Sequence, residues 1–245
     1  MAGARGEFEK IAAFVKRFPR AQVPVGIGDD CAVVRPSARA ELCVTTDSLV
    51  EDVHFTRAGY RPEEIGHKAL AVNLSDLAAM GARPAWFVCA MELPPWVDDV
   101  VLNGLARGMS ALAKRSGIAL VGGNLSRAKK LSLTLTVTGE VPRGKALLRG
   151  GAKAGELLYV SGTLGDARLG LELLNRPRHR ATEPHPGGPL RRQTRPEPRL
   201  ELGLIARAYA SAAIDISDGL AQDLGHMCRA SGVGAVVELE RLPTS

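Results

Sequence analysis

Residues 131–138 read LSLTLTVT, a strict alternation of apolar Leu or Val with polar Ser or Thr. A period of two is typical of a β-strand with one buried and one exposed face. This stretch carries the clearest strand signal in the chain. It predicts a sheet that other elements cover on one face.

More strands are expected on both sides of this stretch. They lie at 25–35 (VGIGDDCAVVR, after a glycine-rich turn), 41–50 (ELCVTTDSLV), 85–93 (AWFVCAMEL), 118–123 (IALVGG), 156–162 (ELLYVSG) and 235–240 (AVVELE). Helices are expected at 7–18, from Pro62 to Gly81, after Pro95 to Lys114–Arg115, at 166–174, at 199–210 and from Asp218. Strands that alternate with helices indicate an α/β class.

The Gly150–Gly151 pair begins a Gly- and Ala-rich connector, so a domain boundary is predicted there. The domains are then residues 1–149 and 150–245. Within the second, the Arg/Pro-rich stretch 175–199 holds seven Arg against two Glu and accounts for most of the net charge of +6. It contains no aromatic residue, so it indicates a flexible linker more than a nucleic-acid contact.

Composition excludes several classes. The chain has 245 residues, 45% of them apolar, and a mean hydropathy of zero. It holds no run of about 18 apolar residues and no signal peptide at its N-terminus. The four cysteines form no CxxC pair, which excludes a zinc ribbon and favours a reducing cytoplasm.

Carboxylates recur where strands and glycine turns end. They are Asp29, Asp30, Asp47, Asp215 and Asp218, with Asp76 inside a predicted helix. Acidic groups that converge on a ligand crevice repel one another unless cations neutralise them. Mg²⁺ is the natural cation, because protein carboxylates and substrate phosphates commonly bind it together. The alternative for each Asp is a helix cap or turn former. Asp76 fits that alternative poorly, because Asp is a weak helix former.

Two glycine stretches are candidate phosphate cradles, Gly26–Ile27–Gly28 and Gly122–Gly123–Asn124. Neither is a Walker A loop, and no GxSxG or HExxH motif is present. His54 is the histidine nearest in sequence to the acidic group, although a lone histidine is more often structural.

Six blocks in this order resemble the thiamine-monophosphate kinase family, part of the ATP-binding superfamily of aminoimidazole-ribonucleotide synthetase. They are GIGDDCAVV, TTDSLVEDVHF, KALAVNLSDLAAMGARP, LVGGN, LLRGGAKAGELLYVSG and AIDISDGLAQDLGHM. The resemblance implies a mixed-sheet N-terminal domain that binds ATP and dimerises, followed by a C-terminal α/β sandwich. It also implies a homodimer that phosphorylates thiamine monophosphate with ATP and several Mg²⁺ ions.

Site residues follow from the resemblance by position. The implied metal ligands are Asp30, Thr45, Thr46, Asp47, Asp76, Asn124, Asp215 and Asp218. The implied ATP contacts are Gly123, Asn124, Arg149 and Ser217, and His54 falls at a thiamine-phosphate contact. Asp218 and Arg149 are the expected catalytic groups, in a transfer that uses no protein nucleophile.

The chain departs from the family pattern in two places. Position 124 is Asn where the family has Asp, which removes one charge from a metal site. The family also continues past Pro243 with a GGEDYEL-like motif that this chain does not match, so the C-terminal domain is expected to be incomplete. Open alternatives are another superfamily enzyme, such as a hydrogenase-maturation protein, and a non-catalytic module that binds Mg-nucleotide.

Overall fold

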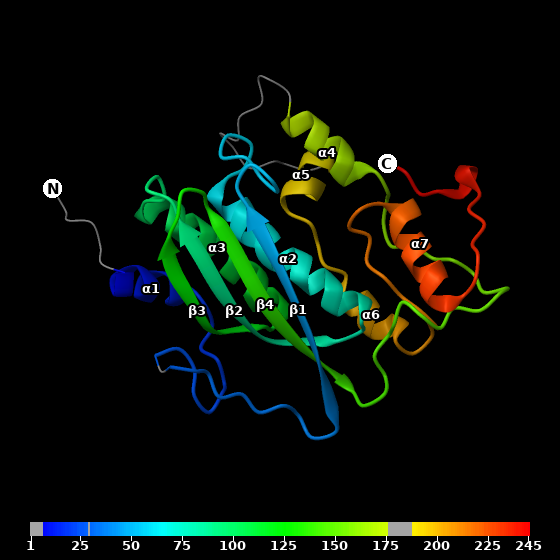
Figure 1. Cartoon of the computed structure of the whole chain (residues 1–245), viewed down its shortest axis with the longest axis horizontal. Helices are drawn as coiled ribbons and strands as arrows, with labels where there is room; N and C mark the ends of the chain where they lie inside the picture. Colours follow the sequence, from blue (N-terminus) through cyan, green and yellow to red (C-terminus); the bar gives the residue numbers. More distant parts are fainter. Residues whose placement is uncertain (1–6, 29, 176–187) are drawn as a thin grey trace.

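The computed structural model describes residues 7–28, 30–175 and 188–245 (Figure 1). A four-stranded mixed sheet contains β1 (Ala40–Val50), β2 (Arg83–Leu93), β3 (Ala119–Arg127) and β4 (Ser132–Pro142). The strand order is β1-β4-β2-β3. Strand β4 is antiparallel to both neighbours, whereas β3 is parallel to β2. These strands and the helices between them confirm the predicted α/β class.

One face of the sheet is covered by α2 (Pro62–Ala79) and α3 (Asp99–Ser116), which lie behind the strands in Figure 1. Alternate residues of β4, Leu133, Leu135 and Val137, are fully buried on this face, as the LSLTLTVT pattern predicted. They share one hydrophobic core with Leu70 of α2 and Met109 of α3. This core holds the N-terminal half together.

Helices α2 and α3 approach each other through glycine. A Cβ atom at Gly66 would lie 2.1 Å from the carbonyl oxygen of Leu105, and one at Gly108 would lie 1.8 Å from that of Glu63. Any side chain at these positions would therefore force the helices apart. The close crossing fixes where α2 presents its polar residues to the sheet.

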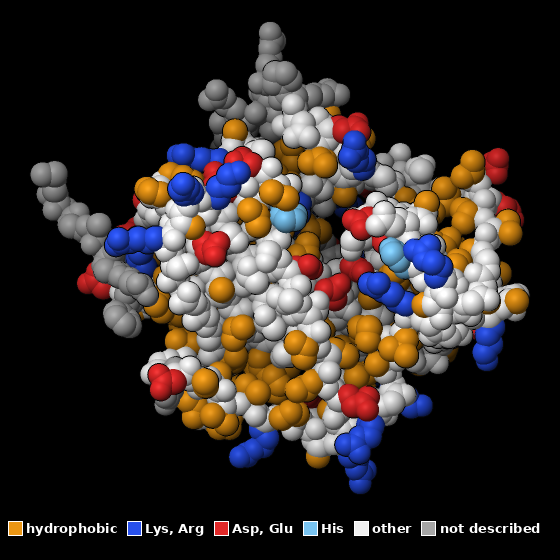
Figure 2. Space-filling model, in the orientation of Figure 1, with side chains coloured by type: hydrophobic (Ala, Val, Ile, Leu, Met, Phe, Trp, Pro, Cys, Tyr) orange, Lys and Arg blue, Asp and Glu red, His pale blue; other side chains and the backbone are white. Residues whose placement is uncertain are grey.

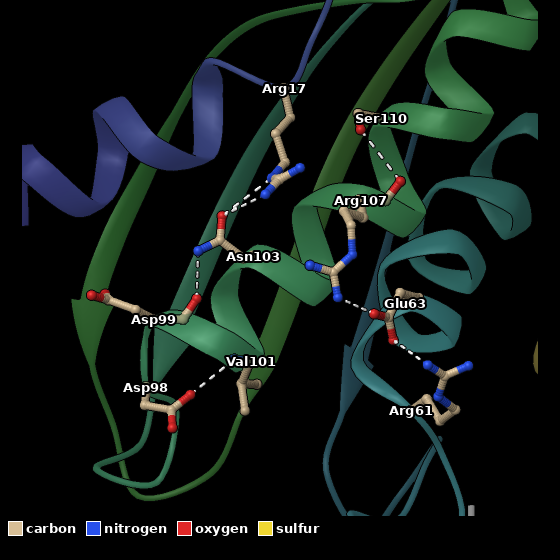
Figure 3. A network of polar contacts seen from close by, with 9 residues as sticks. All are labelled: Arg17, Arg61, Glu63, Asp98, Asp99, Val101, Asn103, Arg107 and Ser110. Carbon is tan, nitrogen blue, oxygen red and sulfur yellow. Dashed lines mark hydrogen bonds and ion pairs between the residues drawn. The ribbon is translucent and has the colours of Figure 1, made fainter. Parts of the chain in front are cut away.

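Polar contacts link α3 to its neighbours on the outer side (Figure 3). Arg17, which follows α1 (Glu7–Val15), donates from Nε and Nη2 to Asn103 Oδ1, each at 3.1 Å. Arg107 of α3 pairs with Glu63 of α2. Asp98 caps α3 by accepting from the Val101 amide at 2.9 Å, which agrees with the predicted start of this helix.

The second half is mainly helical, with α4 (Asp166–Leu174), α5 (Gly188–Thr194), α6 (Leu200–Ala206), α7 (Leu220–Ser231) and a short 3₁₀ turn at Leu239–Arg241. Helix α6 packs against α2 so closely that a Cβ at Gly203 would lie 2.0 Å from Ala78 O. In the described ranges, no helix combines the length and apolar character needed to cross a bilayer.

Three predicted strands do not form. Segment 25–35 forms no strand in its described residues, where Val25 bridges to Val33, and segments 156–162 and 235–240 contain no strand. Their apolar side chains remain largely exposed, with Tyr159 at 84% and Val236 at 92%. A strand requires a neighbour for its backbone N–H and C=O groups, and an apolar run alone does not supply one.

The expectation of a flexible linker over 175–199 is wrong for residues 188–199. This part forms α5 and then packs against the N-terminal half, where the carbonyl oxygen of Pro196 lies 2.8 Å from His67 Nε2. Glu197 pairs with Arg115 at 2.6 Å. Composition missed this because the contacts come from distant helices; residues 176–187 lie outside the described ranges.

Candidate active site

A short hydrogen bond joins the sheet to α2 at the polar end of the core. The side chain of Thr45 lies on the helix-facing side of β1, and its Oγ1 donates to Asp76 Oδ2 at 2.5 Å. Asp76 is half-buried in the last turn of α2. Asp is a weak helix former, so its presence here is better explained by the position in which the helix holds its carboxylate.

Asp215 reaches the same place from the far end of the chain. Its Oδ2 accepts hydrogen bonds from Ser75 Oγ at 3.0 Å and from Ser217 Oγ at 3.1 Å. Ser75 precedes Asp76 on α2, so adjacent residues of one helix orient two different carboxylates. The predicted residues Thr45, Asp76, Asp215 and Ser217 therefore belong to one connected group.

The pKa values show that negative charge accumulates here. Burial raises the pKa of Asp76, the hydrogen bond from Thr45 lowers it, the charges of Asp215 and Asp47 raise it further, and Arg149 lowers it. Partial burial and then the charge of Asp215 raise the pKa of Asp47, while His54 opposes that rise. The charge of Asp215 thus raises the pKa of both Asp47 and Asp76, and a cluster of carboxylates like this one is suited to bind a cation.

A groove of about 800 Å³ runs between β1, α2 and the segment around Asp215. Its lining includes Thr45, Asp76, Met80, Arg149 and Asp215. Figure 2 shows acidic side chains in the middle of this face, where the surface is hollowed between the two halves. A groove of this volume, with carboxylates and one guanidinium, has the size and the charges to hold a small polyanion together with cations.

His54 and Arg149 both interact electrostatically with the acidic group. His54 follows β1, where its Nδ1 accepts from the Val50 amide at 3.0 Å. The charge of His54 lowers the pKa of Asp47, and the charge of Arg149 lowers the pKa of Asp76.

Asp218 lies next to this group but points to solvent. Its Oδ2 accepts from Gln222 Nε2 at 2.8 Å, and its side chain is exposed. The backbone amides of residues 217–219 all donate to Asp223 on the first turn of α7.

Several predicted site residues are not brought to Asp76. Thr46 faces the opposite side of β1, where its Oγ1 donates to Leu135 O at 3.0 Å. Gly123 and Asn124 lie on β3, which is separated from β1 by β4 and β2 and thus by about 14 Å at the usual strand spacing. Asp30 is exposed in the loop that precedes β1.

Gly123 and Asn124 instead line a small pocket of about 60 Å³ between β3 and α1. Its other walls are apolar and include Phe14, Ile27 and Met91. The backbone is crowded there, because a Cβ at Gly123 would lie 2.1 Å from Cys89 O. Gly123 therefore allows β3 to pack closely against β2.

Sequence reasoning missed two residues. Ser75 could have been found from its place between Asn73 and Asp76 in NLSDL, because its neighbour Asp76 was already a candidate. Asp223 carried no usable signal, since it lies beyond the usual helix-capping positions and its partners are backbone amides.

Sequence comparison finds two matching profiles. That of the AIR synthase related protein N-terminal domain matches residues 28–141, and that of the C-terminal domain matches residues 153–245. Thiamine-monophosphate kinase from Salmonella typhimurium is 44% identical over 244 residues, which cover 99% of this chain and 74% of that protein.

Solved structures give a concordant result. The crystal structure of thiamine-monophosphate kinase from Stenotrophomonas maltophilia is similar with a TM-score of 0.88 and 44% identity, covering 98% of this chain and 77% of that one. The structure of AaThiL complexed with AMPPCP and TMP is similar with a TM-score of 0.79 and 37% identity, covering 98% and 75%. E. coli HypE, a hydrogenase maturation protein, shares the fold at 23% identity and a TM-score of 0.73.

Proposed function

Since the chain belongs to the AIR synthase related family and, within it, to the thiamine-monophosphate kinases, we propose that it transfers the γ-phosphate of ATP to thiamine monophosphate. The observation that carries this proposal is the groove lined by Asp76, Asp215 and Arg149, together with the charge interactions of Asp47 with both of these carboxylates. Phosphoryl transfer needs positioning and charge compensation more than a protein nucleophile, and these residues offer both.

The donor set suits Mg²⁺. Carboxylate and hydroxyl oxygens are its preferred ligands, and it binds through one or two carboxylates while it retains water and phosphate ligands. Within the described ranges, no three His, Cys, Asp or Glu side chains lie close enough to hold a metal ion by themselves, so Mg²⁺ bound there would need further ligands from water and substrate phosphates. We assign the site to Asp47, Asp76 and Asp215 with Thr45, and we include Asp30, Thr46, Asn124 and Asp218 on the strength of the family resemblance. Mg²⁺ bound there would offset charge on the phosphates.

The other residues act on the substrates directly. Arg149, exposed at the groove, supplies positive charge to the transferring phosphate. His54 is assigned to the acceptor phosphate, because it lies beside Asp47 at the end of β1. Gly123, Asn124 and Ser217 are assigned to ATP. The acceptor's phosphate oxygen attacks the γ-phosphorus in line, and Asp218 helps to orient the reacting groups.

We also propose a homodimer through the N-terminal domain, residues 1–149. The sheet face opposite α2 and α3 exposes Leu42, Val44 and Val88, with Val44 at 62%. Figure 2 shows hydrophobic side chains on the lower part of this face. The distance between Asn124 and Asp76 within one chain also supports a dimer, because the β3 strand of a partner copy could bring a second Asn124 to the groove. Residues 150–245 form the other domain in this proposal, and the cysteine spacing supports a cytoplasmic location.

An ADP-release assay with thiamine monophosphate and Mg²⁺ tests the function. We expect turnover that requires both, and we expect Asp76→Asn to abolish most of it. A matched control is Asp166→Asn, which changes a carboxylate outside the groove. ATP binding without turnover would refute the kinase and identify a nucleotide-binding module. Turnover of a different acceptor would point to another enzyme of the superfamily.

A further inference from the structure

Three backbone amides converge on one buried carboxylate next to the groove. The N–H groups of Ser217, Asp218 and Gly219 donate to Asp223 Oδ2 at 3.0, 3.1 and 3.1 Å. Asp223 is 5% exposed and lies on the first turn of α7. The Asp223 carboxylate therefore binds the backbone of Asp218, an assigned metal ligand, and of Ser217, an assigned ATP contact.

This contact shapes the loop. Successive amides can point at one oxygen only if the chain curls around it, and Gly219 permits this with φ 126° and ψ 155°. The Asp223 amide closes the curl by donating to Gly219 O at 3.0 Å. With the backbone turned inward, the side chains of Ser217 and Asp218 project outward.

The two outward side chains bond to polar neighbours. Ser217 Oγ donates to Asp215, and Asp218 accepts from Gln222. Asp215 in turn accepts from Ser75 of α2. The carboxylate of Asp223 is thus connected to both Asp215 and Asp218 through the single loop that it organises.

A carboxylate suits this role better than a neutral group. Its oxygen has enough negative charge to accept three N–H bonds, and the amides with the helix N-terminus compensate that charge without a cation. Hydrogen bonds to a charged acceptor are stronger than neutral ones. The hydrogen bonds that Asp223 accepts come from the backbone of residues 217–219, which do not line the groove, so it acts through the loop.

We propose that Asp223 is a positioning residue that holds the 217–219 loop so that Asp215 and Asp218 are preorganised to bind a divalent cation. The assignment of Asp215 and Asp218 as cation ligands rests on the proposed function, whereas the hold of Asp223 on the loop can be tested without metal. Residues that orient metal ligands from behind commonly contribute 10–100-fold to metal affinity.

The first measurement is amide hydrogen exchange in the metal-free protein. In Asp223→Ala, we expect exchange at residues 217–219 to accelerate about tenfold or more, because three bonds to a charged acceptor are lost. In Asp223→Asn, which keeps one acceptor oxygen, we expect an intermediate rate. The matched control is Asp166→Ala, another buried carboxylate on the first turn of a helix (7% exposed), which accepts from Thr163 and Ser245. It should leave residues 217–219 unchanged.

The second measurement is binding of Mn²⁺, followed by its paramagnetic resonance signal without nucleotide. Mn²⁺ takes the same oxygen ligands as Mg²⁺. We expect about tenfold weaker binding for Asp223→Ala, a smaller loss for Asp223→Asn and no loss for Asp166→Ala. Thermal unfolding of each variant separates this effect from general destabilisation.

Two results would overturn the inference. One is exchange at residues 217–219 that is unchanged in Asp223→Ala. The other is Mn²⁺ affinity in Asp223→Ala that equals the wild type or exceeds it, as expected if the carboxylate merely caps α7 or blocks an anion site. A failed kinase assay in the wild type would reject the proposed function and leave both measurements interpretable.

Discussion

Ser75 of α2 donates its hydroxyl hydrogen to Asp215 at 3.0 Å, across 140 positions of sequence. The neighbouring residue Asp76 accepts from Thr45 of β1 at 2.5 Å. One turn of α2 therefore ties together the first strand and the segment that leads into α7. Because the ends of this link come from distant parts of the chain, the groove exists only when both halves are folded.

Ser75→Ala should weaken the site with little effect on folding. The variant leaves Asp215 with Ser217 as its remaining hydroxyl donor and loses about 1 kcal/mol of stability. We expect the Mg²⁺ concentration for half-maximal turnover to rise about tenfold. Ser75→Thr keeps the hydroxyl and is the control. Equal Mg²⁺ requirements in all three proteins would show that the bond does not orient Asp215.

Asp76→Asn should stabilise the metal-free protein while it removes activity. The charges of Asp215 and Asp47 and burial raise the pKa of Asp76, so its ionised form opposes folding at neutral pH. The amide oxygen of Asn can still accept from Thr45. We expect Tm without metal to rise on the order of 1–3 °C at pH 7. A lower Tm at this pH would contradict the charge argument.

Asn124→Asp should lower the Mg²⁺ concentration needed for half-maximal turnover. A carboxylate binds Mg²⁺ more strongly than an amide oxygen does. Asn124 is exposed on β3, so the substitution should not disturb the core. Asn103→Asp, on α3 outside the groove, is a control for added charge. A variant that requires more Mg²⁺ would show that residue 124 is not a ligand.

Lys68 should make the stability of the protein depend on alkaline pH. Burial lowers the pKa of Lys68 to about 8, and its Nζ lies 3.3 Å from Tyr60 Oη. Between that value and 10.5, the ordinary pKa of a lysine side chain, the unfolded chain binds more protons than the folded one. The free energy of unfolding therefore rises with pH across this window. Below the window, Lys68 is protonated in both states, and the folded protein bears the full cost of burying its charge.

Lys68→Met isolates this effect. We expect the variant to lack the alkaline rise, so that its stability relative to the wild type is greatest at pH 7 and decreases by pH 10. Urea unfolding at the two pH values measures the difference, with Lys145→Met as an exposed control. A difference between wild type and variant that stays constant with pH would contradict the assigned pKa.

Local patterns predicted the central elements well, for reasons that lie within each segment. The alternation at 131–138 produced β4 because one face of that strand is buried and the other is not. Asp98 and Gly117 delimit α3 through their own backbone and side-chain geometry. The recurrence of carboxylates at strand and turn ends had already singled out Asp76 and Asp215, and the family resemblance gave them a shared role that no local spacing indicates.

Long-range packing settled what these patterns left open. The segments 156–162 and 235–240 have strand-like sequences but no strand neighbours, and the Arg/Pro-rich residues 188–199 fold because α2 and α3 receive them. The role of Ser75 depends on a partner 140 positions away. Asp223 bonds to backbone only four to six positions away, but its role also depends on tertiary structure, because the loop that it holds meets α2 through Asp215. Residue types and periodicity report on a segment's own backbone and burial, whereas hydrogen bonds that orient a site depend on how distant segments meet.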